Sequence, residues 1–143
     1  MLWISPDQVL DEMATTDMEG VTLGFAKYLD WNFTLTAVAI LLFREAVYVT
    51  LGEELLFRGL IGGILFRRFG FHTGNLLQTA IFVLPHLLIL VLVPGLWPMI
   101  VVWAAAGWLM GWLYFRTGSI VPGWIAHTLG NVLATLQMVL IFF

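Results

Sequence analysis

The sequence predicts an all-α integral membrane protein: a compact bundle of about four transmembrane helices, the first long or broken, with a short N-terminal surface helix. Of the 143 residues, 61% are hydrophobic and 10% are charged, whereas soluble domains are roughly 45–50% apolar and about 25% charged. A soluble fold of this size could not bury so much apolar surface, so we expect lipid to be the solvent. Apolar stretches near the ~20 residues that cross a ~30 Å hydrocarbon core also recur between short turns.

The first segment, residues 1–30, differs in composition from the rest of the chain, because it holds six of the nine acidic residues. Ser5 suits a helix N-cap and Pro6 suits the first helical position. We therefore expect an acidic surface helix within residues 1–30 and a transmembrane core over residues 31–143.

The core is expected to contain four apolar segments, over residues 32–66, 75–93, 98–115 and 120–143. The first segment ends at Arg67 and Arg68, with Gly70 beyond it as a stop signal. As one helix it would measure roughly 52 Å, which is too long for a single crossing. We expect a break or kink near Gly52, or a first part that lies along the membrane interface.

The basic residues predict the orientation. Arg67, Arg68 and Arg116 flank two turns on one side of the membrane, and the turn over residues 94–98 carries no charge. The positive-inside rule places the arginine side in the cytoplasm. We expect a protein integral to the cell (plasma or inner) membrane, with its N-terminus outside if the first segment crosses once and inside if it crosses an even number of times.

Small residues recur four apart in the core: Gly59 and Gly63, Gly107 and Gly111, Ala126 and Gly130, Gly130 and Ala134. Such pairs let membrane helices approach closely. They predict a tight bundle and no particular function.

Polar residues inside the apolar segments are the functional candidates. A charge at a helix centre in a bilayer costs at least ~2.5–3.5 kcal/mol, so it is rarely accidental. At ~1.5 Å per residue, the candidates lie roughly 14–20 Å from the cytoplasmic helix ends. They are Glu53, Glu54, Arg58, His86, His127 and the amide of Asn131.

The spacing divides these residues into roles. Glu54 and Arg58 are four apart and are expected to pair along one helix face. Glu53 projects about 100° away from Glu54, so we expect it to face a cavity. His127 and Asn131 are also four apart and can point into the same cavity.

Each of these features also has a purely structural interpretation. A Glu–Arg pair can be a neutralised structural pair, and a lone histidine can be a hydrogen-bonding strut. Their common depth favours function. Arg44 and Glu45 are expected near the outer interface, solvated or snorkelling, and Pro85 is expected to bend its helix beside His86.

The composition restricts the chemistry of a membrane protease. The chain has no cysteine, which excludes disulfides, thiolate metal sites and cysteine nucleophiles, and its six Lys and Arg residues cannot form a basic face for nucleic acid. The only serines, Ser5 and Ser119, lie at helix ends, no Asp follows Asp30, and no H-E-x-x-H motif occurs. What remains is a glutamate general base that activates water, with His and Asn as partners.

Three motifs resemble those of the CAAX protease and bacteriocin-processing (CPBP, or Abi) family of membrane proteins. They are the E-E-x-x-x-R motif at residues 53–58, the F-x-x-x-H motif at residues 82–86 and the H-x-x-x-N motif at residues 127–131. The resemblance covers about residues 46–140 and implies intramembrane proteolysis.

The resemblance also implies a role for each motif residue. Glu53 would deprotonate the attacking water, which His86 would help to hold. His127 and Asn131 would stabilise the oxyanion, and the family's supporting residues would be Glu54, Arg58 and Phe82. No cofactor is favoured. The alternative is Zn²⁺ held by Glu53, His86 and His127, which we favour less because asparagine is a poor zinc ligand and suits an oxyanion hole.

Two functions stay open from the sequence. The first is an intramembrane endopeptidase that cuts a peptide or a membrane-protein tail near the cytoplasmic face. The second is a non-catalytic subunit or assembly factor of a larger membrane complex, in which Gly123 gives room for a pigment or haem ligated by His127. The expected partners are a peptide or membrane-protein substrate and the lipid bilayer, together with that larger complex under the second function, and no nucleic acid is expected.

Overall fold

The computed structural model describes residues 35–142, and every element in this range is a helix. The expected surface helix and the boundary after residue 30 lie outside the described residues. In chain order the elements are α2 (Leu35–Phe43), the π-helix η2 (Arg44–Thr50), α3 (Leu51–Glu53), the π-helix η3 (Glu54–Gly62), α4 (Gly63–Leu92), the 3₁₀-helix η4 (Pro94–Leu96), α5 (Met99–Thr117) and α6 (Val121–Phe142).

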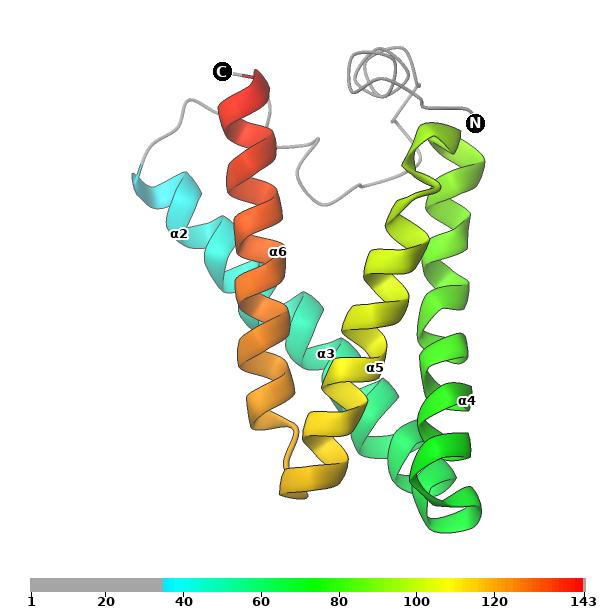
Figure 1. The fold of residues 1–143 in the computed structure, drawn as a ribbon. Coiled ribbons are helices and arrows are strands. Elements are labelled where there is room, and N and C mark those ends of the chain that lie inside the picture. Colours follow the sequence, from blue (N-terminus) through cyan, green and yellow to red (C-terminus); the bar gives the residue numbers. More distant parts are fainter. Residues whose placement is uncertain (1–34, 143) are drawn as a thin grey trace.

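The elements α2 to η3 form one long helix that runs diagonally across the other helices (Figure 1). The break expected near Gly52 is wrong, because Leu51 and Glu53 on either side of it keep right-handed helical torsions. The irregularity takes another form: two π-helical stretches, η2 and η3, flank the three residues of α3. A π-helix bonds residue i to i+5, so it rotates the following side chains relative to an α-helix.

The predicted helix ends at Gly70 and Gly118 are confirmed. Both glycines have a positive φ, 72° and 68°, which an L side chain rarely adopts. Gly70 kinks α4 so sharply that its upstream part belongs to the diagonal helix, and the next helix continues from Phe71, earlier than the expected residue 75. Pro85 lies inside α4, where the only residue with non-helical torsions is Gly70, so the bend beside His86 stays a prediction.

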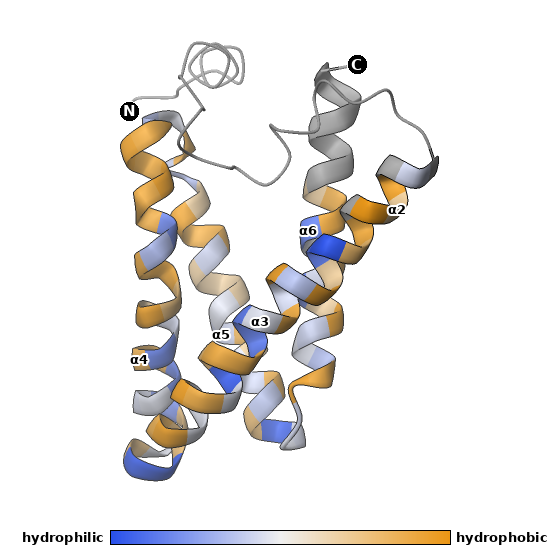
Figure 2. Cartoon of the chain, turned by 180° about the vertical axis from the view of Figure 1, so that it is seen from behind, coloured by the Kyte–Doolittle hydropathy of each residue, from blue (hydrophilic) through white to orange (hydrophobic). Residues whose placement is uncertain are grey.

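The described part of the chain buries several polar side chains beside a small apolar core and exposes many large apolar ones. Its buried polar side chains are Glu45, Thr50, Glu54, Arg58, Asn75, Gln78 and Thr79. Large apolar side chains such as Leu88 and Val91 are 69% and 77% exposed, and hydrophobic residues, coloured orange in Figure 2, make up much of the helices. Among the described residues, two helical stretches are long and apolar enough to cross a membrane: Val38–Leu92, which includes the kink at Gly70, and Met99–Thr117. These features are typical of a helical membrane protein.

The arginine-bearing turns lie at one end of the molecule. Figure 1 shows the turn at Gly70 and the turn between α5 and α6 at the same end, and Arg67, Arg68 and Arg116 are exposed there. From their shared turn α5 and α6 separate, and the opposite end holds the turn between α4 and α5 (Figure 1).

The glycine pair of α5 lets this helix pack closely against α4. A Cβ at Gly107 would lie 3.0 Å from the Phe82 ring, and one at Gly111 would collide with the Asn75 side chain. The close approach predicted for this pair is confirmed. The small residues of α6 act differently: nothing lies within 4 Å of a Cβ at Gly130.

Candidate active site

A cavity of about 280 Å³ opens among α3, α4, α5 and α6. The four residues expected to carry chemistry, Glu53, His86, His127 and Asn131, all line it. The small residues Ala126, Gly130 and Ala134 of α6 form part of its wall, so on this helix they leave room for the cavity.

The two adjacent glutamates have different environments, as their spacing predicted. Glu54 Oε1 lies 3.0 Å from Arg58 Nη1, and both side chains are fully buried. Glu53 lines the cavity and keeps 29% of its side chain exposed. The predicted pairing of Glu54 with Arg58 and the predicted exposure of Glu53 to the cavity are therefore confirmed.

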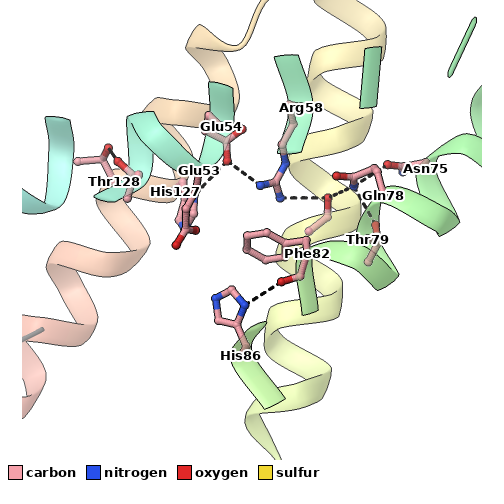
Figure 3. A network of polar contacts seen from close by, with 12 residues as sticks. Glu53, Glu54, Arg58, Asn75, Gln78, Thr79, Phe82, His86, His127 and Thr128 are labelled. Atoms are coloured by element: carbon pink, nitrogen blue, oxygen red, sulfur yellow. Dashed lines mark hydrogen bonds and ion pairs between the residues drawn. The ribbon is translucent and has the colours of Figure 1, made fainter. Parts of the chain in front are cut away.

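His127 lies between the two glutamates (Figure 3). Its Nδ1 is 3.0 Å from Glu54 Oε1, and its Nε2 is 3.6 Å from Glu53 Oε2. An ionised carboxylate only accepts hydrogen bonds, so Nδ1 carries a hydrogen and donates it to Glu54. Nε2 then faces Glu53 and the cavity, and it donates a hydrogen bond only when the imidazole is protonated.

His86 is held by its own helix. Its Nδ1 lies 2.8 Å from the Phe82 carbonyl oxygen one turn earlier. A carbonyl oxygen only accepts, so Nδ1 donates, and Nε2 of the neutral ring is left as an acceptor. His86 thus shares the cavity with Glu53, and its free lone pair can receive a hydrogen bond from a water there.

Phe82 packs between the other motif residues. Its ring is 2% exposed and lies between Arg58 and His86 (Figure 3). The Arg58 guanidinium carbon is 4.2 Å from the ring centroid, and the His86 ring is 4.7 Å away. The aromatic ring therefore supports both groups, by a cation–π contact and by ring packing.

A buried amide cluster on α4 was missed by the sequence reasoning. Gln78 Nε2 lies 2.9 Å from the Gly107 carbonyl oxygen, which is also 3.4 Å from Arg58 Nη2. Asn75 donates to the Trp108 carbonyl oxygen at 3.1 Å and accepts from Gln78. Spacings of three and four residues between polar side chains in an apolar helix were the available signal.

Glu45 is buried, which corrects the expectation that it lies solvated at the outer interface. It is 7% exposed, and its carboxylate accepts from Arg44 at 2.7 Å and from Asn131 Nδ2 at 3.4 Å. Glu45 and Thr50 are the buried residues of η2 and are five apart, which is the hydrogen-bond spacing of a π-helix. The π-helix therefore turns Glu45 toward α6.

The room beside Gly123, which the sequence suggested for a pigment or haem, is filled by protein atoms in the described structure. A Cβ at Gly123 would lie 2.9 Å from Glu54 Oε2 and 3.6 Å from Met110 Cβ. Glycine at this position lets α6 approach the buried carboxylate. The space beside Gly123 is filled by protein atoms rather than open to a planar cofactor.

The proposed zinc ligands do not fit a metal site. Within residues 35–142, no three His, Asp or Glu side chains are grouped closely enough to hold one ion. We therefore derive no chemical step through Zn²⁺.

Comparison with known proteins identifies one family. The sequence model of the family described as "Rce1-like: Type II CAAX prenyl endopeptidase Rce1-like" matches residues 34–133, which are 100 of the 143 residues and contain all three motifs. Searches of curated proteins and of solved structures gave no match. The resemblance noted from the motifs is thereby confirmed.

Proposed function

Because the chain belongs to the Rce1-like family of type II CAAX prenyl endopeptidases, we propose that it is an intramembrane endopeptidase in which Glu53 activates water. The observation that carries this proposal is the shared cavity: the Glu53 carboxylate, two histidines and one amide line a space of about 280 Å³. That space is large enough for a water molecule and a peptide carbonyl, the two reactants of hydrolysis.

In the proposed mechanism Glu53 removes a proton from a water that also donates a hydrogen bond to His86 Nε2. The resulting hydroxide attacks the peptide carbonyl carbon and forms a tetrahedral oxyanion. His127, through Nε2–H, and Asn131, through Nδ2–H, donate hydrogen bonds to that oxyanion. When the C–N bond breaks, protonated Glu53 returns its proton to the leaving amine, which restores the carboxylate.

His127 lies among charged groups. Those that contact it are Glu53 and Glu54, and Arg58 pairs with Glu54. With the arginine charged and both glutamates ionised, these three side chains have a net charge of −1. In the proposed mechanism both ring nitrogens of His127 carry a hydrogen when the oxyanion forms: Nδ1–H donates to Glu54, and Nε2–H donates to the oxyanion.

We further propose the membrane topology. The helical stretches 35–69, 71–92, 99–117 and 121–142 each cross the bilayer, the first with a strong tilt, and the arginine-bearing end lies in the cytoplasm. The cavity then lies roughly 14–20 Å from that face. A substrate enters as a peptide or membrane-protein tail, and the family description suggests a prenylated C-terminal CAAX sequence.

The test is cleavage by the full chain in liposomes. The probe is a prenylated CAAX peptide, with the same peptide unprenylated as the comparison, and mass spectrometry locates the cut. Glu53→Gln keeps the shape and removes the base, so its rate should fall by about 10²–10⁴-fold. Leu55→Ala, a change at a 53% exposed apolar position two residues away, is the matched control and should cleave like the wild type.

Three results would overturn the proposal. Cleavage by Glu53→Gln at the wild-type rate would show that Glu53 is not the base. Inhibition by chelators together with one bound zinc per chain would replace the water-activating step by metal chemistry. Absence of cleavage of either peptide, with Glu53→Gln also fully functional in cells, would favour the non-catalytic subunit.

A further inference from the structure

A third carboxylate lies next to the proposed oxyanion site, outside the three motifs. Glu45 is on η2, eight residues before Glu53, and is 7% exposed. Its Oε1 accepts from Arg44 Nη1 at 2.7 Å, and its Oε2 lies 3.4 Å from Asn131 Nδ2. A buried charge is costly to keep in a membrane helix, so Glu45, which contacts a cavity-lining amide, is a candidate for a functional role.

The contact determines which way the Asn131 amide faces. A carboxylate only accepts hydrogen bonds, so the amide must turn its NH₂ group, and not its oxygen, toward Glu45. The NH₂ group has two hydrogens. Glu45 takes one of them, and the other is left for the cavity that Asn131 lines. The opposite rotamer would present the amide oxygen to a developing oxyanion, which would repel it.

Two neighbouring contacts hold η2 and α6 in register around this pair. Thr50 and Thr128 are joined by a hydrogen bond of 2.8 Å, and Trp124 Nε1 donates to the Ala46 carbonyl oxygen at 2.6 Å. Glu45 therefore does not have to hold the helices together, because other bonds do so. Neither of these two contacts involves Asn131, whereas Glu45 accepts a hydrogen bond from its amide.

We propose that Glu45 is a positioning residue for the reaction: it orients the Asn131 amide so that a nitrogen, and not an oxygen, faces the oxyanion. This inference rests on the proposed function. Glu45 acts through Asn131 alone, and Arg44 occupies the other oxygen of the Glu45 carboxylate.

The isosteric substitution Glu45→Gln is the decisive variant. Arg44 only donates hydrogen bonds, so the new amide keeps its contact with Arg44 by pointing its oxygen at the guanidinium. Its NH₂ group then faces Asn131. Asn131 then has to turn its oxygen toward residue 45, and the amide inverts. The kcat for the prenylated CAAX peptide should fall at least 10-fold. The upper limit is the about 10²–10³-fold loss that removal of one oxyanion donor causes, and KM and Tm should stay near the wild-type values.

A double-mutant cycle separates positioning from a structural role. If Glu45 acts through Asn131, the double variant Glu45→Gln/Asn131→Ala has the same kcat as Asn131→Ala alone. Thr50→Val, which removes the neighbouring bond between the same two helices, is the control and should lower Tm while leaving kcat unchanged. A removal of the competing donor, Arg44→Met in the Glu45→Gln background, should restore part of kcat.

The failures of the two proposals are distinguishable. Multiplicative losses in the cycle, or a wild-type kcat for Glu45→Gln, would overturn the positioning role while Glu53→Gln remains inactive. A fully active Glu53→Gln would instead overturn the proposed function. A double-mutant cycle measured by Tm tests the contact between Glu45 and Asn131 without an activity assay. The Tm of the double variant Glu45→Leu/Asn131→Ala should fall by less than the sum of the two single decreases. An additive decrease in Tm would contradict the contact.

Discussion

Arg58→Met tests whether the buried ion pair holds the bundle together. The guanidinium is fully buried, 3.0 Å from Glu54 Oε1, 3.4 Å from the Gly107 carbonyl oxygen and 4.2 Å from the Phe82 ring centroid. Removing one partner of a buried pair costs about 3–5 kcal/mol, because the other charge is left uncompensated. Glu54 keeps one bond, to His127 at 3.0 Å, so we expect the lower end, about 3 kcal/mol.

The assay is unfolding in mixed detergent micelles, followed by the fluorescence of the seven tryptophans. The matched control is Arg67→Met, which removes an exposed arginine farther along the chain and should change the free energy of unfolding by less than about 1 kcal/mol. The double variant Glu54→Gln/Arg58→Met removes both charges and should recover part of the loss. Equal effects of Arg58→Met and Arg67→Met would refute the reasoning.

Three glycines give further predictions. Gly111→Ala pushes a methyl group into the buried amide cluster of α4 and should cost about 1–3 kcal/mol in unfolding. Gly52→Ala meets no atom within 4 Å and should be neutral or stabilising by up to about 1 kcal/mol; equal stabilities would contradict the close approach of α4 and α5. Gly123→Ala places a Cβ 2.9 Å from Glu54 Oε2 and should slow cleavage by displacing that carboxylate. Leu129→Ala, at a 58% exposed position of α6 outside the cavity lining, is the control and should cleave at more than half the wild-type rate; the reverse order would contradict the placement of α6.

Local features of this chain could be predicted from the sequence. Gly70 and Gly118 end helices because they adopt a positive φ, a property of glycine itself. The pairing of Glu54 with Arg58 follows from a spacing of four on one helix, and it survives in η3 because both side chains still face the bundle. These predictions needed only the geometry of a single helix.

Features that depend on helix type or on a second helix were not predictable in the same way. The burial of Glu45 depends on η2 being a π-helix, which rotates it relative to the α-helical period assumed from the sequence. The closeness of Gly123 to Glu54 depends on how near α6 comes to η3. The buried cluster of Asn75 and Gln78 had a spacing signal, but its partners are backbone carbonyls of α5, which no side-chain pattern marks.

The account rests on water reaching the cavity that Glu53, His86, His127 and Asn131 share inside the membrane. The chain has no cysteine, so single cysteines introduced on α6 can be labelled with a membrane-impermeant thiol reagent in liposomes. Gly130→Cys lies on the cavity wall, and Leu133→Cys, three residues away, replaces a 65% exposed side chain that does not line it. We predict fast labelling at position 130 and protection at position 133; equal protection of both cysteines would show a dry cavity and contradict the account.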